Sequence, residues 1–204
     1  DILVSGSKAI GVKTSDGTDI TAKTAVLANV PPNRLYGEML PAGPVPEDTV
    51  QRGKAYRFGR ADMQIHIALD KPAEWTDERL NNVPGIHVTP GLDGVSQAVN
   101  EAERGLLPHT ATIVAGQPAT HDPSRVPEGK GQLWIQLQEL PRVIKGDAAG
   151  EIKTPADGAW TSDVAERYAD RIVARLEHHI PGLSSSILGR KVLSPADLES
   201  LNCN

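Results

Sequence analysis

Two stretches of strict alternation constrain the fold of this chain most. Residues 61–70 have the sequence ADMQIHIALD and residues 132–140 the sequence QLWIQLQEL, and in both stretches apolar side chains alternate with polar or small ones. Successive side chains of a β-strand point to opposite faces of the sheet, so each stretch predicts a strand with one buried face. Two such strands favour a sheet whose apolar face packs against helices.

The other face of these two predicted strands carries amphipathic side chains. Gln64 and His66 lie on it in the first strand, and Trp134, Gln136 and Gln138 lie on it in the second. If the strands are neighbours, these residues are candidates to line a cavity for a mostly apolar substrate, whose orientation a few polar groups would set. The alternative is a face exposed to solvent, which is common in antiparallel sheets.

Helical periodicity marks two further segments. Residues 93–105 place apolar side chains at helical spacing, with Asp93 as the expected N-terminal cap. Residues 163–180 carry the strongest apolar stripe, and a third helix is expected after Ser194, which suits a capping position. Because strands and helices do not alternate strictly, the sequence predicts an α+β fold with a mixed or antiparallel sheet and helices on one face.

The first 40 residues have a different pattern. Residues 8–28 predict a hairpin with a tight turn at Asp16-Gly17, a pair suited to positive φ at both central positions. The run AVLA at residues 25–28 has no polar neighbour, so it predicts a strand buried on both faces, as in a parallel sheet. Ligands of open α/β sheets bind beyond the carboxyl ends of such strands, where residues 29–31 would lie; a plain strand-to-loop transition is the alternative.

Composition argues against several classes of protein. The net charge is −5 with scattered Lys and Arg, which argues against nucleic-acid binding. Cys203 is the single cysteine, and the adjacent His178 and His179 would point about 100° apart on a helix, so we expect no metal site. No apolar run approaches the roughly 20 residues of a membrane helix, and no signal-peptide pattern is present at the start. A cytoplasmic or peripheral membrane location is expected, and the oligomeric state is left open.

Two blocks of the sequence resemble the phytoene-desaturase-like FAD-dependent oxidoreductases of the amine-oxidase superfamily. Residues 6–32, GSKAIGVKTSDGTDITAKTAVLANVPP, are similar to a hairpin and exit strand of that family. Residues 98–141 resemble its helix, glycine and proline followed by the segment DPSRVPEGK, here Asp122–Lys130. With residues 187–202 the resemblance spans most of the chain.

The resemblance implies an FAD cofactor that accepts a hydride from an apolar substrate. The dinucleotide fingerprint G-x-G-x-x-G is absent from these residues, so we expect a substrate-binding fragment that does not retain FAD by itself. The family's pattern places Ala28, Asn29 and Pro31 near the cofactor. It implies no catalytic residue here, because the flavin performs the redox chemistry, and it gives the loop Asp122–Lys130 a structural role.

The expected domain plan has four parts. They are a partial FAD domain at residues 1–40, a linker at residues 41–60, a substrate-binding domain at residues 61–193, and the start of a return to the FAD domain at residues 194–204. One alternative is a stand-alone α+β module that binds an apolar ligand or a protein partner without redox activity. Another is a scaffold segment that binds no ligand.

Overall fold

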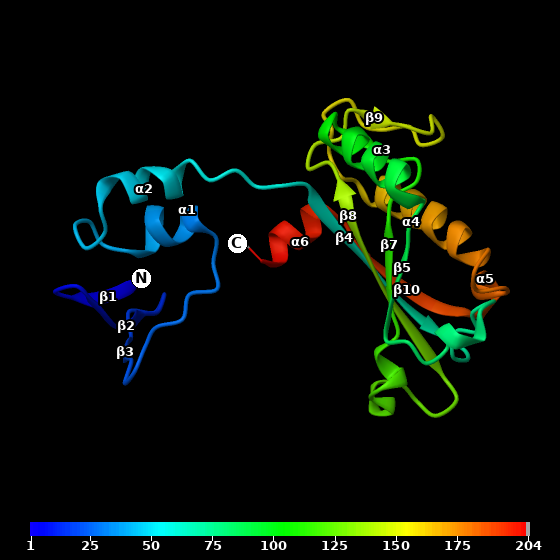
Figure 1. The fold of residues 1–204 in the computed structure, drawn as a ribbon, viewed down its shortest axis with the longest axis horizontal. Helices are drawn as coiled ribbons and strands as arrows, with labels where there is room; N and C mark the ends of the chain where they lie inside the picture. The colour runs from blue at the N-terminus through cyan, green and yellow to red at the C-terminus, as the bar shows by residue number, and fades with distance from the viewer. Residues whose placement is uncertain (203–204) are drawn as a thin grey trace. The chain divides into compact units, whose positions relative to one another are not determined.

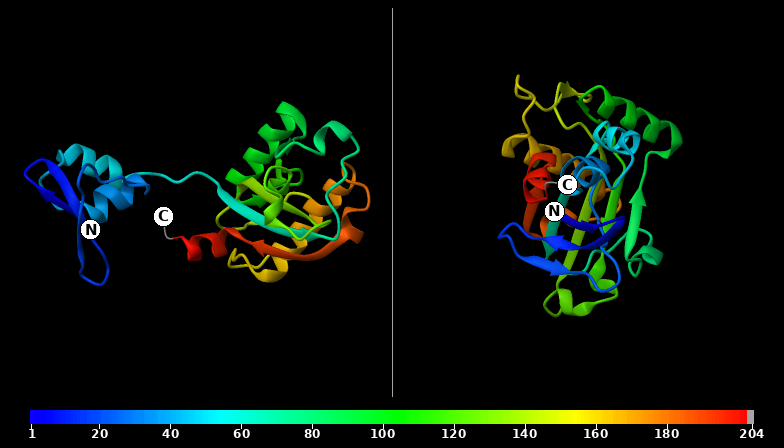
Figure 2. Two further views of the ribbon diagram at one scale, coloured as in Figure 1. Left: turned by 90° about the horizontal axis from the view of Figure 1, so that it is seen from below. Right: turned by 90° about the vertical axis from the view of Figure 1, so that its left-hand side faces the viewer.

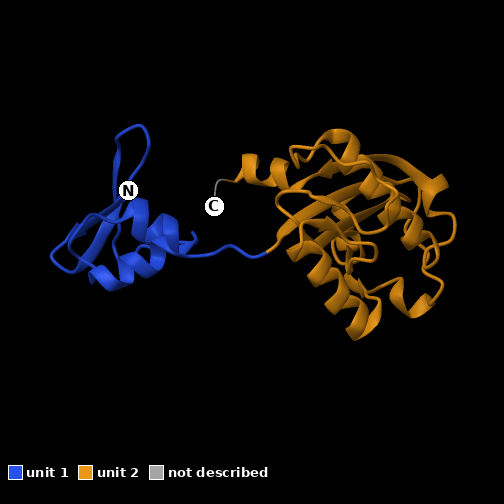
Figure 3. Cartoon of the chain, turned by 90° about the horizontal axis from the view of Figure 1, so that it is seen from above, with its two compact units in different colours: residues 1–59, 203–204 blue, residues 60–202 orange. Residues whose placement is uncertain are grey.

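The computed structural model describes residues 1–202, so Cys203 lies outside the described part. The chain divides into two compact units, residues 1–59 and residues 60–202 (Figure 3). The boundary falls directly before the first of the two alternating stretches.

Unit 1 begins with a small antiparallel sheet in the order β1-β2-β3. Its strands are β1 Ile2–Ser5, β2 Lys8–Lys13 and β3 Asp19–Thr21. The expected hairpin is present between β2 and β3, but its turn is wider than predicted. Gly17 has a φ of +88°, but Asp16 does not have the positive φ that the predicted turn requires, because only glycines have a positive φ in the described chain. Instead, the Asp16 carboxylate accepts a hydrogen bond from the backbone amide of Thr18.

The prediction of a buried strand at residues 25–28 is wrong for the structure described. This segment is not a strand, and the side chain of Leu27 is 94% exposed. Its backbone forms no hydrogen bond with the backbone of another described residue. The physical reason is that a strand needs partners to form a ladder, and no described strand lies beside this run.

Helical segments follow in unit 1. They are α1 Pro32–Arg34, a π-helical turn at Leu35–Met39, and α2 Glu47–Lys54. The segment expected as a linker therefore contains a helix. Acidic residues in the first turn of α2 and basic residues in its last turn suit the helix dipole. Gly53 allows α2 to pack closely on Tyr36, because a Cβ atom at Gly53 would lie 2.8 Å from the Cβ atom of Tyr36.

Unit 2 is built on a five-stranded antiparallel sheet in the order β10-β4-β8-β7-β5 (Figure 1). The strands are β4 Ala61–Leu69, β5 Gly85–Val88, β7 Ile113–Gly116, β8 Gly131–Leu140 and β10 Ile187–Leu193. The two alternating stretches are thus confirmed as the neighbouring strands β4 and β8. The α+β class with an antiparallel sheet is also confirmed.

One face of this sheet forms the core of unit 2. Helix α4, Ser162–Glu177, lays its apolar stripe against the buried side chains of β4 and β8. Fully buried members of this core include Met63, Ile65, Leu133, Ile135, Tyr168 and Ile172. The alternation in β4 and β8 therefore reflects a helix-covered face and a face without helices.

Three further helices belong to unit 2. They are α3 Gly91–Glu103, α5 Leu183–Ser186 and α6 Pro195–Leu201. The expected cap of α3 is wrong: the helix begins two residues before Asp93, and Pro90 occupies the capping position without a side-chain hydrogen bond. Helix α4 is capped by Thr161. The cap that the sequence predicts for α6, Ser194, is confirmed. Within residues 1–202, none of the helices combines the length and apolar composition that crossing a membrane requires.

The segment at residues 142–160 is mostly irregular and contains one short strand. This strand, β9 Gly146–Asp147, pairs in parallel with β6 Leu106–Leu107. Asp147 accepts hydrogen bonds from the amides of Glu151 and Ile152 and from Arg171 on α4. The loop is thus anchored to the core. The remaining regular elements are 3₁₀ turns at Glu78–Leu80, Pro118–Thr120 and Pro123–Arg125.

Candidate functional site

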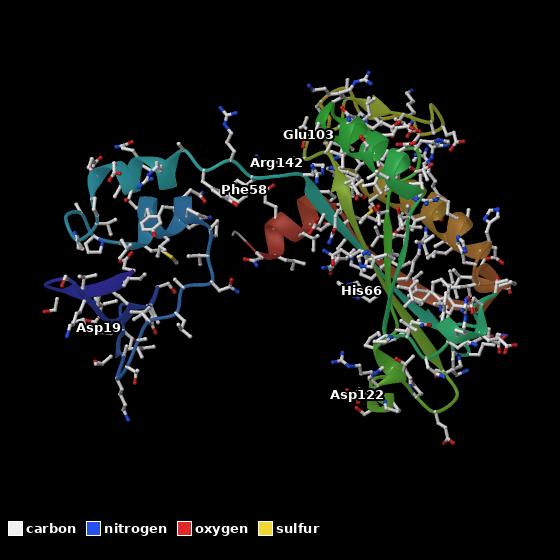
Figure 4. All side chains as sticks on the ribbon, in the orientation of Figure 1. Asp19, Phe58, His66, Glu103, Asp122 and Arg142 are labelled. Atoms are coloured by element: carbon white, nitrogen blue, oxygen red, sulfur yellow. The ribbon has the colours of Figure 1, made fainter. Side chains whose placement is uncertain are left out.

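The candidate site lies on the helix-free face of the five-stranded sheet. The strand register places Lys191 opposite His66, and His66 opposite Trp134. Trp134 is in turn opposite Gly116 on β7. One row of neighbouring residues therefore crosses the sheet from its edge strand β10 to β7. Figure 4 labels His66, which β4 contributes to this row.

Gly116 determines how the Trp134 indole lies. A Cβ atom at Gly116 would be 2.9 Å from Cε3 of Trp134, closer than real Cβ contacts allow. The absent side chain thus leaves room for the ring to lie across β7. Glycine within a strand often marks such a close approach. The result is a flat, partly exposed aromatic surface in the middle of the helix-free face, which is also called the open face below.

A cavity of about 1000 Å³ lies over this surface. Its floor is formed by the open face around His66 and Trp134, with small residues at Ala68 and Gly189 beside them. Leu188 borders it on β10. The chain before β8 contributes Arg125, Val126, Pro127 and Lys130. This volume is at the upper end of what small-molecule sites usually have.

The loop that borders the cavity is stiffened by its own residues. The Asp122 carboxylate accepts hydrogen bonds from the amide of Ser124 at 3.3 Å and from Nε of Arg125 at 3.2 Å. The Ser124 hydroxyl donates to the same carboxylate, and this bond, with the others, lowers the pKa of Asp122. Asp122, labelled in Figure 4, therefore has the structural role expected of it, and its bond to Arg125 holds that cavity-lining residue.

The five residues predicted to line a substrate cavity share the open face, but they do not all reach the cavity. His66 and Trp134 line it. Gln64 and Gln136 are opposite each other one row away; Gln64 contacts Nε2 of His66 at 3.2 Å, and Gln136 donates to Asp62 at 3.1 Å. Gln138 is exposed beyond them. A role in substrate binding stays a prediction for all five.

Several cavity residues were not predicted from the sequence. Gly116, Lys191 and the loop residues 125–127 belong to segments far apart in the chain, which only the strand order brings together. The glycine within an otherwise β-prone run was the one local signal that could have indicated a close approach.

The residues predicted to lie near a cofactor belong to unit 1, whereas every cavity residue belongs to unit 2. Ala28 and Asn29 are exposed. Pro31 precedes α1, and its carbonyl accepts hydrogen bonds from the amides of Arg34 and Leu35. In the part of the chain from residue 1 to residue 202, no three or more His, Cys, Asp or Glu side chains are grouped to hold a metal ion.

Comparisons with known proteins give distant relatives. No family model matches the chain. The mouse (Mus musculus) pyridine nucleotide-disulfide oxidoreductase domain-containing protein 2 is 25% identical over 97% of this chain and 34% of its own length. Chloroplastic prolycopene isomerase 2 of an Oncidium hybrid cultivar is 26% identical, and chloroplastic prolycopene isomerase of Arabidopsis thaliana is 24% identical. Each of these two alignments covers 95% of this chain and 29% of the relative.

The chain thus spans about a third of the length of the curated relatives it matches. Their names describe an oxidoreductase domain in one case and an isomerase in the other. At this identity and coverage the names describe the relatives, and they assign no family to this chain.

Proposed function

We propose that this chain is the substrate-binding portion of an FAD-dependent oxidoreductase of the phytoene-dehydrogenase-like kind. In this proposal it orients an apolar substrate for hydride transfer to the flavin. The observation that carries the proposal is the cavity of about 1000 Å³ on the helix-free sheet face, with the Trp134 indole laid over Gly116 at its floor. A broad aromatic surface suits an apolar ligand.

The relatives support the redox part of the proposal. Their alignments extend over nearly all of this chain and over about a third of their own length, which agrees with one part of a larger enzyme. One relative carries an oxidoreductase domain in its name, and others act, by name, on prolycopene. A cytoplasmic or peripheral membrane location accompanies the proposal.

The residues at the end of the AVLA run fit a cofactor. Ala28 is small and exposed, and the backbone groups of Ala28 and Asn29 make no backbone hydrogen bond to other described residues. Unused amide and carbonyl groups beside a small side chain allow a cofactor to approach the backbone. Ala28, Asn29 and Pro31 would therefore help to hold FAD in the intact protein. When bound, FAD supplies the hydride acceptor.

The remaining tasks belong to the cavity residues. Trp134 offers an apolar surface that excludes water from one side of the substrate, and His66 offers a polar group beside it. The contact between His66 and Gln64 limits the rotation of the imidazole ring. Holding the substrate in one orientation is itself catalytic, since it removes the entropy cost of alignment from the reaction step.

Flavin content of the intact protein tests the cofactor assignment. We expect the wild-type protein to purify with FAD and Ala28→Leu to lose most of it, because the larger side chain occupies the approach to the backbone. The matched control is Ala42→Leu, which changes another exposed alanine of unit 1. Equal flavin stoichiometry, measured by absorbance, in Ala28→Leu and wild type would contradict the placement of residues 28–31.

One observation favours a second candidate function, that of a stand-alone binding module: all residues that line the cavity belong to unit 2. A stand-alone module could therefore bind an apolar ligand without redox chemistry. The two candidates differ in the flavin content of the intact protein. A protein that binds an apolar ligand in this cavity but never purifies with flavin, and is not reconstituted by added FAD, would be the binding module.

A further inference from the structure

We propose that the cavity on the helix-free face takes an amphipathic anion, a molecule with an apolar body and a carboxylate or phosphate head. The inference rests on the proposed function for the location of the substrate site, and it adds the chemical class of the substrate. The apolar body would lie on Trp134, and the head would be held by Lys130, Lys191 and the end of Arg125.

The charges that border the cavity are of one sign. Four of its lining residues are Lys or Arg, and none is Asp or Glu. The cationic residues are Arg125, Lys130, Arg190 and Lys191. The chain as a whole carries a net charge of −5, so this local excess of positive charge runs against its overall composition.

Two of these four cations, Lys130 and Lys191, have no ionic partner among the described residues, and Arg125 is paired through one nitrogen only. Arg190 pairs with Glu166 at 2.6 Å and with Asp170 at 2.7 Å on α4. Arg125 uses only its Nε atom, which donates to Asp122. That bond holds the side chain while its terminal nitrogens stay without a hydrogen-bond partner among residues 1–202.

Lys130 and Lys191 form no ion pair or hydrogen bond through their side chains within the described residues. The hydrogen bonds from Ser194 are the main cause of the lowered pKa of Asp197, and the charge of Lys191 contributes to it. The Asp197 carboxylate does not pair with Lys191, because it accepts the hydrogen bond from the Ser194 hydroxyl at the start of α6. Asp62 is on the open face as well, yet it accepts from Gln136 and does not line the cavity. The two lysines are thus available to a ligand.

The two unpaired lysines border the cavity from two different segments of unit 2. Lys191 lies on the edge strand β10, in the row that continues through His66 to Trp134. Lys130 precedes β8 on the loop that borders the same cavity. A neutral ligand would displace water from these cations and offer no charged partner in its place. An anionic head would instead form charge-assisted hydrogen bonds with the two ammonium groups.

Calorimetric titration of the intact protein with monomeric dodecanoate and with 1-dodecanol tests the proposal. We expect dodecanoate to bind about tenfold more tightly than the alcohol, and added salt to reduce that preference. Lys130→Gln and Lys191→Gln should each weaken dodecanoate binding about threefold and leave dodecanol binding unchanged. The control is Lys153→Gln, an exposed lysine of unit 2 outside the cavity.

Equal affinity for the acid and the alcohol would overturn the anionic class while leaving an apolar substrate in place. A loss of affinity in Lys153→Gln as large as in the cavity variants would also overturn it. So would binding to phosphatidylcholine vesicles that contain phosphatidylglycerol without binding to monomeric dodecanoate, since this indicates attraction to a membrane surface. Flavin content of the same samples keeps the two proposals separate: a flavin-free protein that prefers dodecanoate supports the anion and contradicts the oxidoreductase.

Discussion

At the residue scale, the pair Arg171–Asp147 is the most consequential polar contact in unit 2. Arg171 donates from Nη1 and Nη2 to the two oxygens of Asp147 at 2.8 and 2.7 Å. The side chains are 10% and 1% exposed, respectively. The pair joins α4 to the last residue of β9, and the centroid of the Tyr168 ring lies 5.3 Å from the guanidinium carbon of Arg171.

We expect Asp147→Asn to destabilise the protein by about 3 kcal/mol, because the change leaves the buried Arg171 charge with only the exposed carboxylate of Glu151, at 3.2 Å, as its ionic partner. Asp170→Asn is the matched control, since its carboxylate pairs with Arg190 but is 66% exposed; its cost should stay below about 1 kcal/mol. Urea denaturation measures both variants. Equal free energies of unfolding for the two variants would contradict the assigned importance of the buried pair.

The same pair predicts the acid stability of the protein. Burial works against ionisation of Asp147, but Arg171 and the amides of Ile152 and Glu151 outweigh it, so the pKa of this carboxyl is lowered. Its stabilisation is therefore present above the unfolded value, about 3.9, and is lost as the pH falls through the lower folded pKa. In Asp147→Asn this part of the acid dependence should disappear.

Gly116 gives a second prediction at the scale of single residues. Gly116→Ala should force the Trp134 ring to move and cost about 1–3 kcal/mol, with a change in tryptophan fluorescence. Gly85→Ala is the control, because Gly85 lies opposite Gly116 and a Cβ atom there would meet nothing within 4 Å. If both variants have the emission spectrum of the wild type, the ring does not lie over Gly116.

At the scale of elements, the cap of α6 links a sequence motif to a measurable stability. The Ser194 hydroxyl accepts from the Asp197 amide, while the Asp197 carboxylate accepts from the Ser194 amide. Ser194→Ala should destabilise α6 by about 1 kcal/mol, seen as faster hydrogen exchange of its amides. Ser96→Ala, in the interior of α3, should leave stability equal or slightly higher. Unchanged exchange in Ser194→Ala would contradict the capping box.

Elements were predictable where their signal is local. The alternation of β4 and β8 and the stripe of α4 come from burial on one face, which a sequence pattern records directly. The AVLA run has an equally apolar pattern, yet Leu27 is exposed, because a strand exists only when neighbours complete its ladder. The start of α3 was missed since no side chain caps it.

At the scale of the whole molecule, the candidate site was predictable only in part. His66 and Trp134 followed from alternation, and the register made them neighbours. Lys191, Gly116 and the Arg125–Lys130 loop joined them through the strand order β10-β4-β8-β7, which no local pattern encodes. Figure 2 shows these strands as one continuous twisted sheet of unit 2. The fold class can therefore be predicted from local sequence patterns, whereas the residues that line a cavity depend on the strand order.

The most direct test is a crystal structure of the intact protein with FAD and a bound apolar ligand. The account predicts that the ligand lies on the helix-free sheet face, in contact with Trp134 and His66, with the flavin ring against it. It also predicts the Ala28–Pro31 backbone beside the cofactor. A ligand bound elsewhere, or a flavin whose ring lies far from this face, would contradict the account.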